Sequence, residues 1–254
     1  MLAIERRNEI LEKLQREKKV IVGDLSRIYN VSEETIRRDL ERLENDGYAI
    51  KSYGGAVLNE NVNLELSFDE RKKKNVFEKQ KIAELVSSLV QDGECLMLDA
   101  SSTVALIARK LKEKNNLTVI TNSVEIIVEL FEKHDWHILS TGGVAKEKSF
   151  ALVGPQTDRM LKNYHVDKAI VSAKGIDMEE GFADSDELHA GNKRTMLNCA
   201  TEKILTIDHS KFDQIAFCKI GDFSILDTIV TDEKPADKWL ELFEKKGIRC
   251  IYPE

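Results

Sequence analysis

Polar residues and glycines follow short apolar runs at several points after residue 90. Hydroxyl groups and backbone N–H groups at the start of a helix attract anions, and a lysine adds a positive charge. Each group alone is more simply a helix cap, but ligands collect where the strands of an open α/β sheet end. Together the groups predict a site for an anion of phosphate size. The candidate residues are Asp99, Ser101, Ser102, Thr103, Thr121, Asn122, Gly142, Gly143, Lys174, Asp208 and Lys211.

A second pattern with chemical meaning occupies residues 31–40, which read Val-Ser-Glu-Glu-Thr-Ile-Arg-Arg-Asp-Leu. From residue 36 to residue 43 apolar residues recur at spacings of four and three, so they form the inward face of a helix. The opposite face carries arginines, whose guanidinium groups can pair with guanine edges or with phosphates. A solvated charged face on a protein-interaction module is the competing interpretation. The candidate DNA contacts on this segment are Ser32, Thr35, Arg37, Arg38 and Arg42.

The elements around this segment predict a small N-terminal domain. Helices are expected over residues 5–17, 22–29 and 33–45, with Asn30 in the turn before the third helix and with Leu25 and Ile28 facing inward. Two strand-like runs around a Gly-Gly turn then predict a wing hairpin, whose glycines would let the backbone approach a sugar-phosphate strand. This order is that of a winged helix-turn-helix. The candidate DNA contacts in the wing are Lys51, Tyr53, Gly54 and Gly55.

Strand and helix patterns alternate from residue 77 onward. Short apolar runs predict strands at residues 95–98, 118–121, 137–140, 169–172, 204–207 and 228–230. Helices are predicted at residues 79–90, 103–114, 124–133, 187–201 and 236–246. Such alternation is typical of an α/β fold, here a doubly wound, mostly parallel sheet with helices on both faces. We therefore expect a winged helix-turn-helix domain over residues 1–58, a connector over 59–75 and an α/β domain over 76–254. The basic run Arg71–Lys74 is expected to be a solvated face of the connector.

Composition favours a folded protein of the cytoplasm. No apolar run approaches the roughly 18 residues of a membrane helix, and no signal peptide is expected. The net charge of −7 falls on residues 59–254, because residues 1–58 carry equal numbers of basic and acidic side chains. The neutral segment can still bind DNA if its cations gather on one face. The four cysteines form no C-x-x-C pair, so we expect buried thiols rather than disulfides or a zinc site.

Motifs of common cofactor sites are absent from the sequence. Neither G-x-x-x-x-G-K-[ST] nor G-x-G-x-x-G occurs, so nucleotide binding is unsupported. His134 and His137 lie on either side of a helix-to-strand junction without a third ligand nearby, which favours a solvated loop over a metal site. We therefore expect no cofactor and no metal.

The chain resembles the DeoR family of bacterial regulators over nearly its whole length. The segment V-S-x-x-T-I-R-R-D-L and the later G-G-A match that family's DNA-binding domain, although Lys51 and Tyr53 stand where the family more often has Arg and His. Lys174-Gly175-Ile176-Asp177, Gly181-Phe182 and Asp208-His209-Ser210-Lys211-Phe212 fit its sensor domain. The resemblance implies a fold similar to ribose-5-phosphate isomerase and a phosphorylated sugar or sugar derivative as effector.

The resemblance also implies roles for the candidate residues. Ser101, Ser102 and Thr103 would hold the phosphate. Glu187 would be a carboxylate at a helix cap or a polar wall of the pocket. The carbon chain would be surrounded by Asp99, Thr121, Asn122, Lys174, Asp208 and Lys211.

The function that follows is a DNA-binding transcription regulator whose operator affinity changes with the sugar phosphate, repression being the commoner mode that the resemblance implies. One short helix reads few base pairs, so a symmetric homo-oligomer is expected to bind operator DNA. An isomerase is the competing interpretation, since Asp99, Glu187 or Asp208 could serve as its base. A D-G-A-D-E-like run with paired aspartates is missing, however, and an enzyme has no need of a DNA-binding domain. A metabolite-binding protein without DNA function is the remaining alternative.

Overall fold

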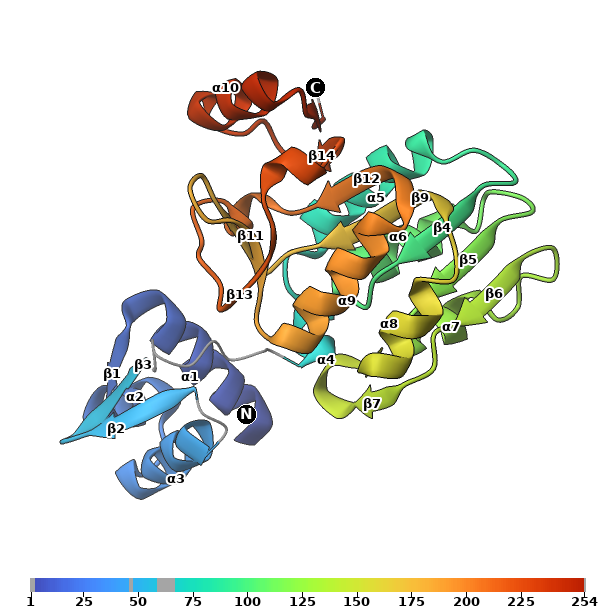
Figure 1. The fold of residues 1–254 in the computed structure, drawn as a ribbon. Helices are drawn as coiled ribbons and strands as arrows, with labels where there is room; N and C mark the ends of the chain where they lie inside the picture. Colours follow the sequence, from blue (N-terminus) through green and yellow to red (C-terminus); the bar gives the residue numbers. More distant parts are fainter. Residues whose placement is uncertain (1–2, 46–47, 59–66, 254) are drawn as a thin grey trace. The chain divides into compact units, whose positions relative to one another are not determined.

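The computed structural model describes residues 3–45, 48–58 and 67–253. The chain divides into two compact units, residues 1–64 and residues 65–254, which are both drawn in Figure 1. Each unit has a hydrophobic core of its own. Within the described ranges, no helix combines the length and apolar character needed to cross a membrane.

The first unit is a winged helix-turn-helix. Its strands pair antiparallel in the order β1-β3-β2, and β2 and β3 form the wing (Figure 1). Asn30 joins the second and third helices in the left-handed conformation, with φ 50°, and α3 buries Ile36, Leu40 and Leu43 as expected. The elements are α1 Ala3–Glu17, β1 Lys19–Ile21, α2 Val22–Tyr29, α3 Glu33–Asn45, β2 Ala49–Ser52 and β3 Gly55–Leu58.

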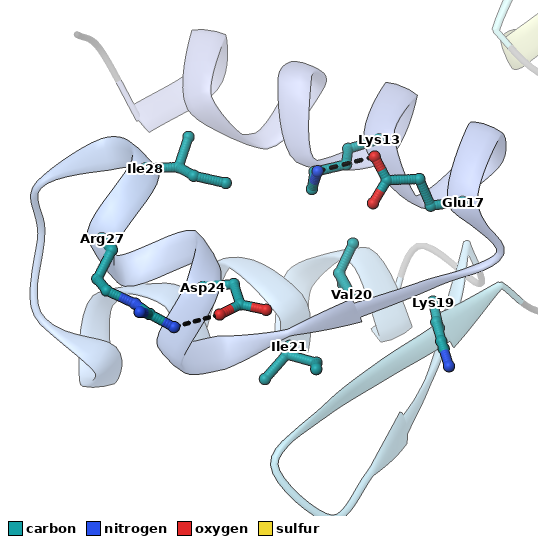
Figure 2. Close-up of a pocket in the computed structure, with 8 residues that line it drawn as sticks. All are labelled: Lys13, Glu17, Lys19, Val20, Ile21, Asp24, Arg27 and Ile28. Atoms are coloured by element: carbon teal, nitrogen blue, oxygen red, sulfur yellow. Dashed lines mark hydrogen bonds and ion pairs between the residues drawn. The ribbon is translucent and has the colours of Figure 1, made fainter.

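Two details of the first unit differ from the expectation. The three-residue strand β1 is not predicted by the sequence, because its pairing with β3 defines it. Ile28, expected to face inward, is 57% exposed. The helix α2 buries Val22 and Leu25 instead, and Ile28 comes one residue before its end. Figure 2 shows the groove that Ile28 lines together with Ile21 and several charged residues.

The second unit is built on a seven-stranded sheet in the order β15-β14-β12-β9-β4-β5-β6. Every pair of neighbouring strands is parallel. The first three predicted strands and the last one have the predicted bounds, whereas β9 and β12 begin earlier than expected. The strands are β4 Cys95–Leu98, β5 Thr118–Thr121, β6 His137–Ser140, β9 Val166–Ser172, β12 Ala200–Thr206, β14 Thr228–Val230 and β15 Arg249–Ile251.

Helices cover both faces of this sheet (Figure 1). On one face, α5, α6 and α7 share a core with Leu96 and Leu98 of β4. On the other face, α8, α9 and α10 share a core with Met97. Alternate side chains of β4 thus point to opposite faces, as strand geometry requires, and the predicted doubly wound fold is confirmed. These helices are α5 Val76–Leu89, α6 Ser102–Leu111, α7 Val124–Leu130, α8 Pro155–Leu161, α9 Glu187–Asn198 and α10 Asp237–Lys246.

Several short elements go beyond the prediction. A three-stranded antiparallel sheet is formed by β10 Gly175–Asp177, β11 Gly181–Asp184 and β13 Cys218–Gly221. A hairpin joins β7 Val144–Lys146 to β8 Ala151–Val153, and 3₁₀ turns occur as η1 Glu147–Ser149, η2 His209–Lys211 and η3 Phe223–Ile225. A further helix, α4 Phe68–Lys73, lies within the predicted connector. The predicted helix over residues 187–201 is too long, because Ala200 and Thr201 already belong to β12.

The cysteines are free thiols, all half-buried rather than fully buried. Burial raises the pKa of the Cys250 thiol to about 11. A thiol with such a pKa stays protonated at neutral pH and is a poor nucleophile. The cysteines are Cys95, Cys199, Cys218 and Cys250.

Candidate functional sites

The strand order of the large sheet reverses between β4 and β9, since β5 and β6 extend it toward one edge and β12, β14 and β15 toward the other. In open α/β sheets a crevice forms at the carboxyl ends of the strands at such a reversal. Asp99, directly after β4, is 1% exposed. It accepts hydrogen bonds from the backbone N–H groups of Ser101 and Ser172, both at 3.0 Å. Its carboxylate therefore joins the ends of β4 and β9 where the fold favours a ligand.

A buried lysine balances the charge of Asp99. Lys193 of α9 lies 3.1 Å from Asp99 and pairs with Asp184 of β11, and its ammonium group donates to the Ser172 carbonyl at 2.7 Å. Burial alone would raise the pKa of Asp184, but the charge of Lys193 and the hydrogen bonds from Lys193 and Ser185 together outweigh burial and lower that pKa to about 2. Burial alone would likewise lower the pKa of Lys193, but the two carboxylates raise it. Asp184 and Lys193 therefore stay ionised at neutral pH.

Hydroxyl side chains next to Asp99 organise the starts of helices. Ser101 caps α6, because its Oγ accepts the Val104 N–H at 3.2 Å. Ser102 and Thr103 are buried in the first turn of that helix. The Thr121 hydroxyl donates to the Leu98 carbonyl at 2.7 Å, which ties the end of β5 to that of β4. The backbone N–H groups of the first turn of α6 are the anion-attracting groups that this arrangement presents.

Asn122 provides a buried acceptor beside these residues. Its side-chain nitrogen donates to the Leu152 carbonyl at 3.0 Å. Its Oδ1 is buried and has no hydrogen-bond partner within the described part of the chain. Leaving a buried polar atom unsatisfied costs about 1–3 kcal/mol. A ligand hydroxyl that donated to this oxygen would remove that cost.

Cations from separate elements crowd together at the same end of the sheet. Lys79 belongs to α5, Lys174 follows β9, and Lys211 lies in η2. Burial lowers the pKa of all three lysines, and repulsion from Arg71 and Lys74 lowers it further. The pKa of Lys79 falls to about 8. Positive charges that are both desolvated and close together are stabilised by a bound anion.

The end of the predicted connector takes part in this cluster. Asn75, with φ 51°, donates to Asp208 Oδ1 at 3.0 Å and to Ser210 Oγ at 3.2 Å. Lys79 donates to the Lys74 carbonyl at 2.6 Å and also to the Arg71 carbonyl. The expectation of a solvated face over residues 71–74 is therefore wrong for Arg71, whose half-buried guanidinium group lies 5.6 Å from the centre of the Phe68 ring.

Two of the predicted groups have other contacts. The Gly142 carbonyl accepts the Thr157 hydroxyl of α8 at 2.8 Å. A Cβ at Gly143 would lie 2.4 Å from that hydroxyl oxygen, so packing against α8 explains the glycine. Glu187 is exposed in the first turn of α9, and the cap itself is Asp186, which accepts the Leu188 N–H at 2.9 Å. The roles of these three residues in ligand binding stay predictions.

Polar residues directly after predicted strands were the signal for the candidate site. That signal does not identify three residues of the buried clusters, which are Lys79, Asp184 and Lys193. For the two lysines, which lie on helices, the available signal was helical spacing. Lys79 stands three and four residues before Ile82 and Ala83, on the buried face of α5. A lysine on an apolar stripe must find a carboxylate, a carbonyl group or a ligand.

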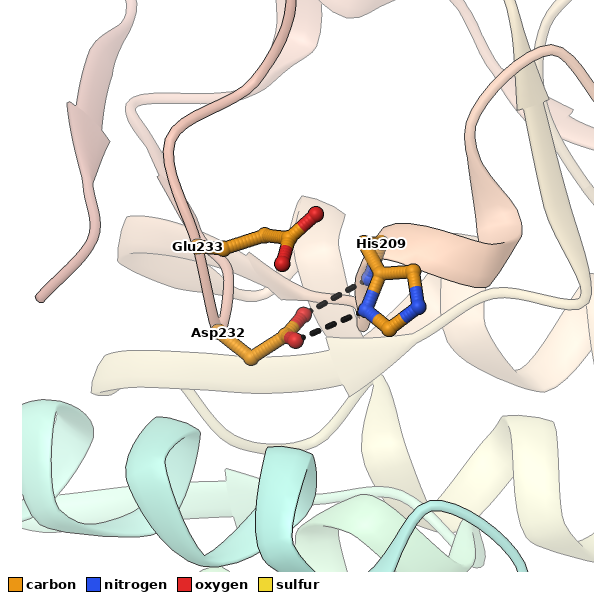
Figure 3. A group of neighbouring side chains, drawn as sticks. All are labelled: His209, Asp232 and Glu233. Carbon is orange, nitrogen blue, oxygen red and sulfur yellow. Dashed lines mark hydrogen bonds and ion pairs between the residues drawn. The ribbon is translucent and has the colours of Figure 1, made fainter.

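One group of side chains in the described ranges has the chemistry of metal ligands. The potential ligand atoms of His209, Asp232 and Glu233 lie within 4.8 Å of one another. Figure 3 shows, however, that both oxygens of Asp232 are directed at His209, one at its backbone N–H and one at Nδ1. This geometry is that of a hydrogen-bonded pair, and the expected absence of a metal stays a prediction.

The predicted DNA-reading face of α3 lies at the surface. Arg37, Arg38 and Arg42 are exposed, and the Ser32 hydroxyl caps the helix by accepting the Thr35 N–H at 3.2 Å. Arg37 lies 2.6 Å from Glu33, and Arg38 lies 3.6 Å from Glu34. To bind DNA, the two arginines would therefore have to leave or share their ion pairs with neighbouring glutamates.

A buried ion pair fixes α3 against α1. Arg6 lies 2.6 Å from Asp39 and Arg7 lies 3.7 Å from it, and Arg6 and Asp39 are both buried. Asp39, the acidic residue of the Ile-Arg-Arg-Asp-Leu run, thus faces inward. It ties the inner face of α3 to α1, while the arginines of α3 are exposed.

The wing residues have different environments. Tyr53 is fully exposed, and Gly54 forms the turn with φ +80°. Lys51 pairs with Glu41 at 3.5 Å and with Glu44 at 3.3 Å on α3. A Cβ at Gly55 would lie 2.1 Å from the Val20 carbonyl oxygen, so its close approach is to β1. The contacts of these residues with DNA stay predictions.

Comparison with known proteins defines the class. Residues 6–62 match the DeoR-like helix-turn-helix domain, and residues 74–233 match the DeoR C-terminal sensor domain. The chain is 37% identical over 249 residues to the HTH-type transcriptional regulator YulB of Bacillus subtilis, with 98% of this chain and 96% of that protein covered. It is 28% identical over 235 residues to the glycerol-3-phosphate regulon repressor of Escherichia coli, with 92% and 93% covered.

The chain is therefore a DNA-binding transcription regulator of the helix-turn-helix type with a sensor domain. It belongs to the DeoR family. Ribose 5-phosphate isomerase A from Methanocaldococcus jannaschii is a similar solved structure, with 21% identity, a TM-score of 0.37 and 55% of each chain covered. The family and the relatives are those of regulators, so the competing interpretation as an isomerase is not supported.

Proposed function

We propose that this regulator represses a sugar-metabolism operon and that a phosphorylated sugar or sugar derivative controls its affinity for operator DNA. A related protein is named for the glycerol-3-phosphate regulon, which supports an effector of this class. We assign DNA binding to residues 1–58, the connection to residues 59–75, and effector binding and oligomerisation to residues 76–254. The protein would act in the cytoplasm, where its operator lies.

The crowding of Lys79, Lys174 and Lys211 is the observation that carries this proposal. A phosphate monoester brings about −1.5 to −2 charges at pH 7, enough to offset repulsion among these partly or fully buried ammonium groups. Asp208 and the unsatisfied Oδ1 of Asn122 supply acceptors for sugar hydroxyls. Both parts of a sugar phosphate thus have complementary groups at the end of one sheet.

We place the phosphate between the first turn of α6 and the lysine cluster. Ser102 and Thr103 would contribute backbone N–H groups, and Lys79 and Lys211 would contribute charge. Asp99 and Thr121 make internal hydrogen bonds to neighbouring strand ends, so we assign them the support of the site rather than the main contacts.

A thermal-shift screen with phosphorylated sugars tests the proposal. A ligand at about 100 times its dissociation constant adds about 2.7 kcal/mol of stability, so a true effector raises the melting temperature of the full chain. The matched controls are the unphosphorylated sugars, which should give no shift, and Lys211→Ala, which should reduce the shift. Equal shifts with and without the phosphate group, or no shift from any phosphorylated sugar, would contradict the proposal.

We also propose that the regulator binds a paired operator as a homo-oligomer. The single reading helix α3 has 13 residues, and such a helix contacts one half-site in the major groove. Sedimentation of the protein with DNA from upstream of its own gene should give complexes with two or more chains per operator. A complex of one chain with a single half-site would contradict this assignment.

Effector and operator should be thermodynamically linked. An effector changes operator affinity by the same factor by which the operator changes effector affinity. Calorimetric titration of the full chain with the sugar phosphate, with and without saturating operator, should give different dissociation constants. Identical constants would show that the sensor does not control DNA binding.

A further inference from the structure

The turn that carries Asp208 and Lys211 is held by the buried side chain of Asp232. Asp232 follows β14, the strand that pairs with β12. Its Oδ1 accepts a hydrogen bond from the backbone N–H of His209 at 2.7 Å, and its Oδ2 lies 2.8 Å from Nδ1 of the same residue. Figure 3 shows both contacts. A carboxylate that is 1% exposed thus directs both of its oxygens at one residue of the turn.

The same turn is attached on the side of the lysine cluster. Asp208 accepts hydrogen bonds from the Asn75 side chain at 3.0 Å and from the Ser210 N–H at 3.1 Å. The Lys211 N–H donates to the Asp208 carbonyl at 3.0 Å. His209 stands between the two residues that the proposed function assigns to the effector. The orientation of its backbone therefore decides where Asp208 and Lys211 point.

We propose that Asp232 is a positioning residue of the effector site. Through its two contacts with His209 it holds the 208–211 turn in the conformation that presents Asp208 and Lys211 to the ligand, and it does not touch the ligand itself. The role rests on the proposed function, because it matters only if this turn contacts an effector.

The charge of Asp232 makes this attachment dependent on the protonation of His209. No lysine or arginine forms an ion pair with Asp232 within the described ranges, and His209 is its partner. The hydrogen bond to Asp232 raises the pKa of His209 against a smaller lowering by burial, and the nearby charges of Asp232, Glu233 and Asp208 raise it further. The contact is strongest while His209 is protonated, and it weakens as the pH rises through the raised pKa.

Four variants of the full chain separate positioning from general damage. Asp232→Ala removes both acceptors, whereas Asp232→Asn keeps the shape and an acceptor for the His209 N–H. Glu233→Ala is the matched control, because it removes a neighbouring carboxylate without a hydrogen bond to the turn in the described structure. His209→Asn places a neutral N–H near the position of Nδ1 and cannot titrate.

Binding is measured by calorimetry with the phosphorylated sugar that gives the largest thermal shift on the wild-type protein. Asp232→Ala should bind roughly tenfold more weakly, as for the loss of one charged hydrogen bond. Asp232→Asn should recover part of this loss, and Glu233→Ala should stay within about twofold of the wild type. Between pH 6 and pH 8, wild-type affinity should fall relative to that of His209→Asn, since only the wild type loses a charge at the turn.

Amide hydrogen exchange gives a readout that needs no ligand. The Lys211 N–H, bonded to the Asp208 carbonyl, should exchange faster in Asp232→Ala than in the wild type and in Glu233→Ala. Unchanged exchange, or equal effector affinity of wild type and Asp232→Ala, overturns the positioning role alone. A wild type that binds no phosphorylated sugar overturns the proposed function instead. If Mn²⁺ or Zn²⁺ stabilised the wild type but not Asp232→Ala, then His209, Asp232 and Glu233 would form a cation site. That result would also overturn the positioning role.

Discussion

Raising the pH from 7 to 9 should weaken effector binding through Lys79. Burial and neighbouring cations lower the pKa of Lys79 to about 8, so its ammonium group is mostly charged at pH 7 and mostly neutral at pH 9. A phosphate monoester is fully ionised over most of this range, because its second pKa is about 6. If only the charged lysine supports binding, the apparent dissociation constant grows roughly tenfold over these two pH units.

Calorimetry measures both the affinity and the proton that accompanies it. At pH 8, titrations in two buffers with different heats of ionisation should show uptake of about half a proton per site, since the bound anion raises the lysine's pKa. Lys79→Arg keeps its charge at every pH of the experiment and should flatten the profile. Lys81→Arg is the matched control, because Lys81 is exposed on the same helix, and it should behave as the wild type does.

Two results would refute this reasoning. If Lys79→Arg showed the same tenfold weakening as the wild type, the titrating group would be a different one. Lys174 and Lys211 would then be the candidates, because burial lowers their pKa values as well. The absence of proton uptake at pH 8 would mean that the bound anion does not interact with Lys79.

Three further substitutions test the remaining assignments. Arg38→Ala should weaken operator binding by about 1–3 kcal/mol and relax specificity at one base pair; binding equal to that of Arg16→Ala, an exposed control on α1, would contradict this in a gel shift. Ser102→Glu should keep operator binding but abolish the response to the sugar phosphate, because like charges repel in a confined site. An unchanged response would move the anion site elsewhere. Lys193→Met leaves two carboxylates buried without their cation and should lower the free energy of unfolding by about 3–5 kcal/mol in urea titrations. A loss below about 1 kcal/mol would mean that solvent screens the cluster.

Short apolar runs were sufficient to predict six of the seven strands of the large sheet. The strand β4 is a run of this kind, and the polar residues that follow it mark its end. The seventh strand, β15, was missed because Arg249–Ile251 is too short and begins with an arginine. The strands β10 and β11 have three and four residues, too few to show a period. They are defined by pairing, because β10 pairs with β11 and β11 pairs with β13. Tertiary contact rather than local pattern sets such strands.

The candidate site was predictable where the chain changes from strand to helix and not where distant segments meet. Asp99, Lys174 and Asp208 follow strands, so their common location comes from the fold class. Lys193 meets Asp99 from a helix that begins 88 residues later in the sequence, and a single sequence carries no record of such a contact. Its position three residues after the buried Ala190 and three residues before the buried Met196 on α9 was a local sign that it faces inward.

The glutamates along α3 bear on how this regulator searches a whole chromosome. If Arg37 and Arg38 bind DNA phosphates as predicted, each must leave its ion pair with Glu33 or Glu34, which frees a carboxylate next to the DNA. Fewer counterions are then released for each contact than the number of arginines suggests, and binding to unrelated sequence weakens. Only a site whose bases form favourable contacts with the arginines compensates for the lost ion pairs and keeps the helix bound for long. The time that the protein spends on random DNA shortens accordingly, and more copies remain free to reach the operator.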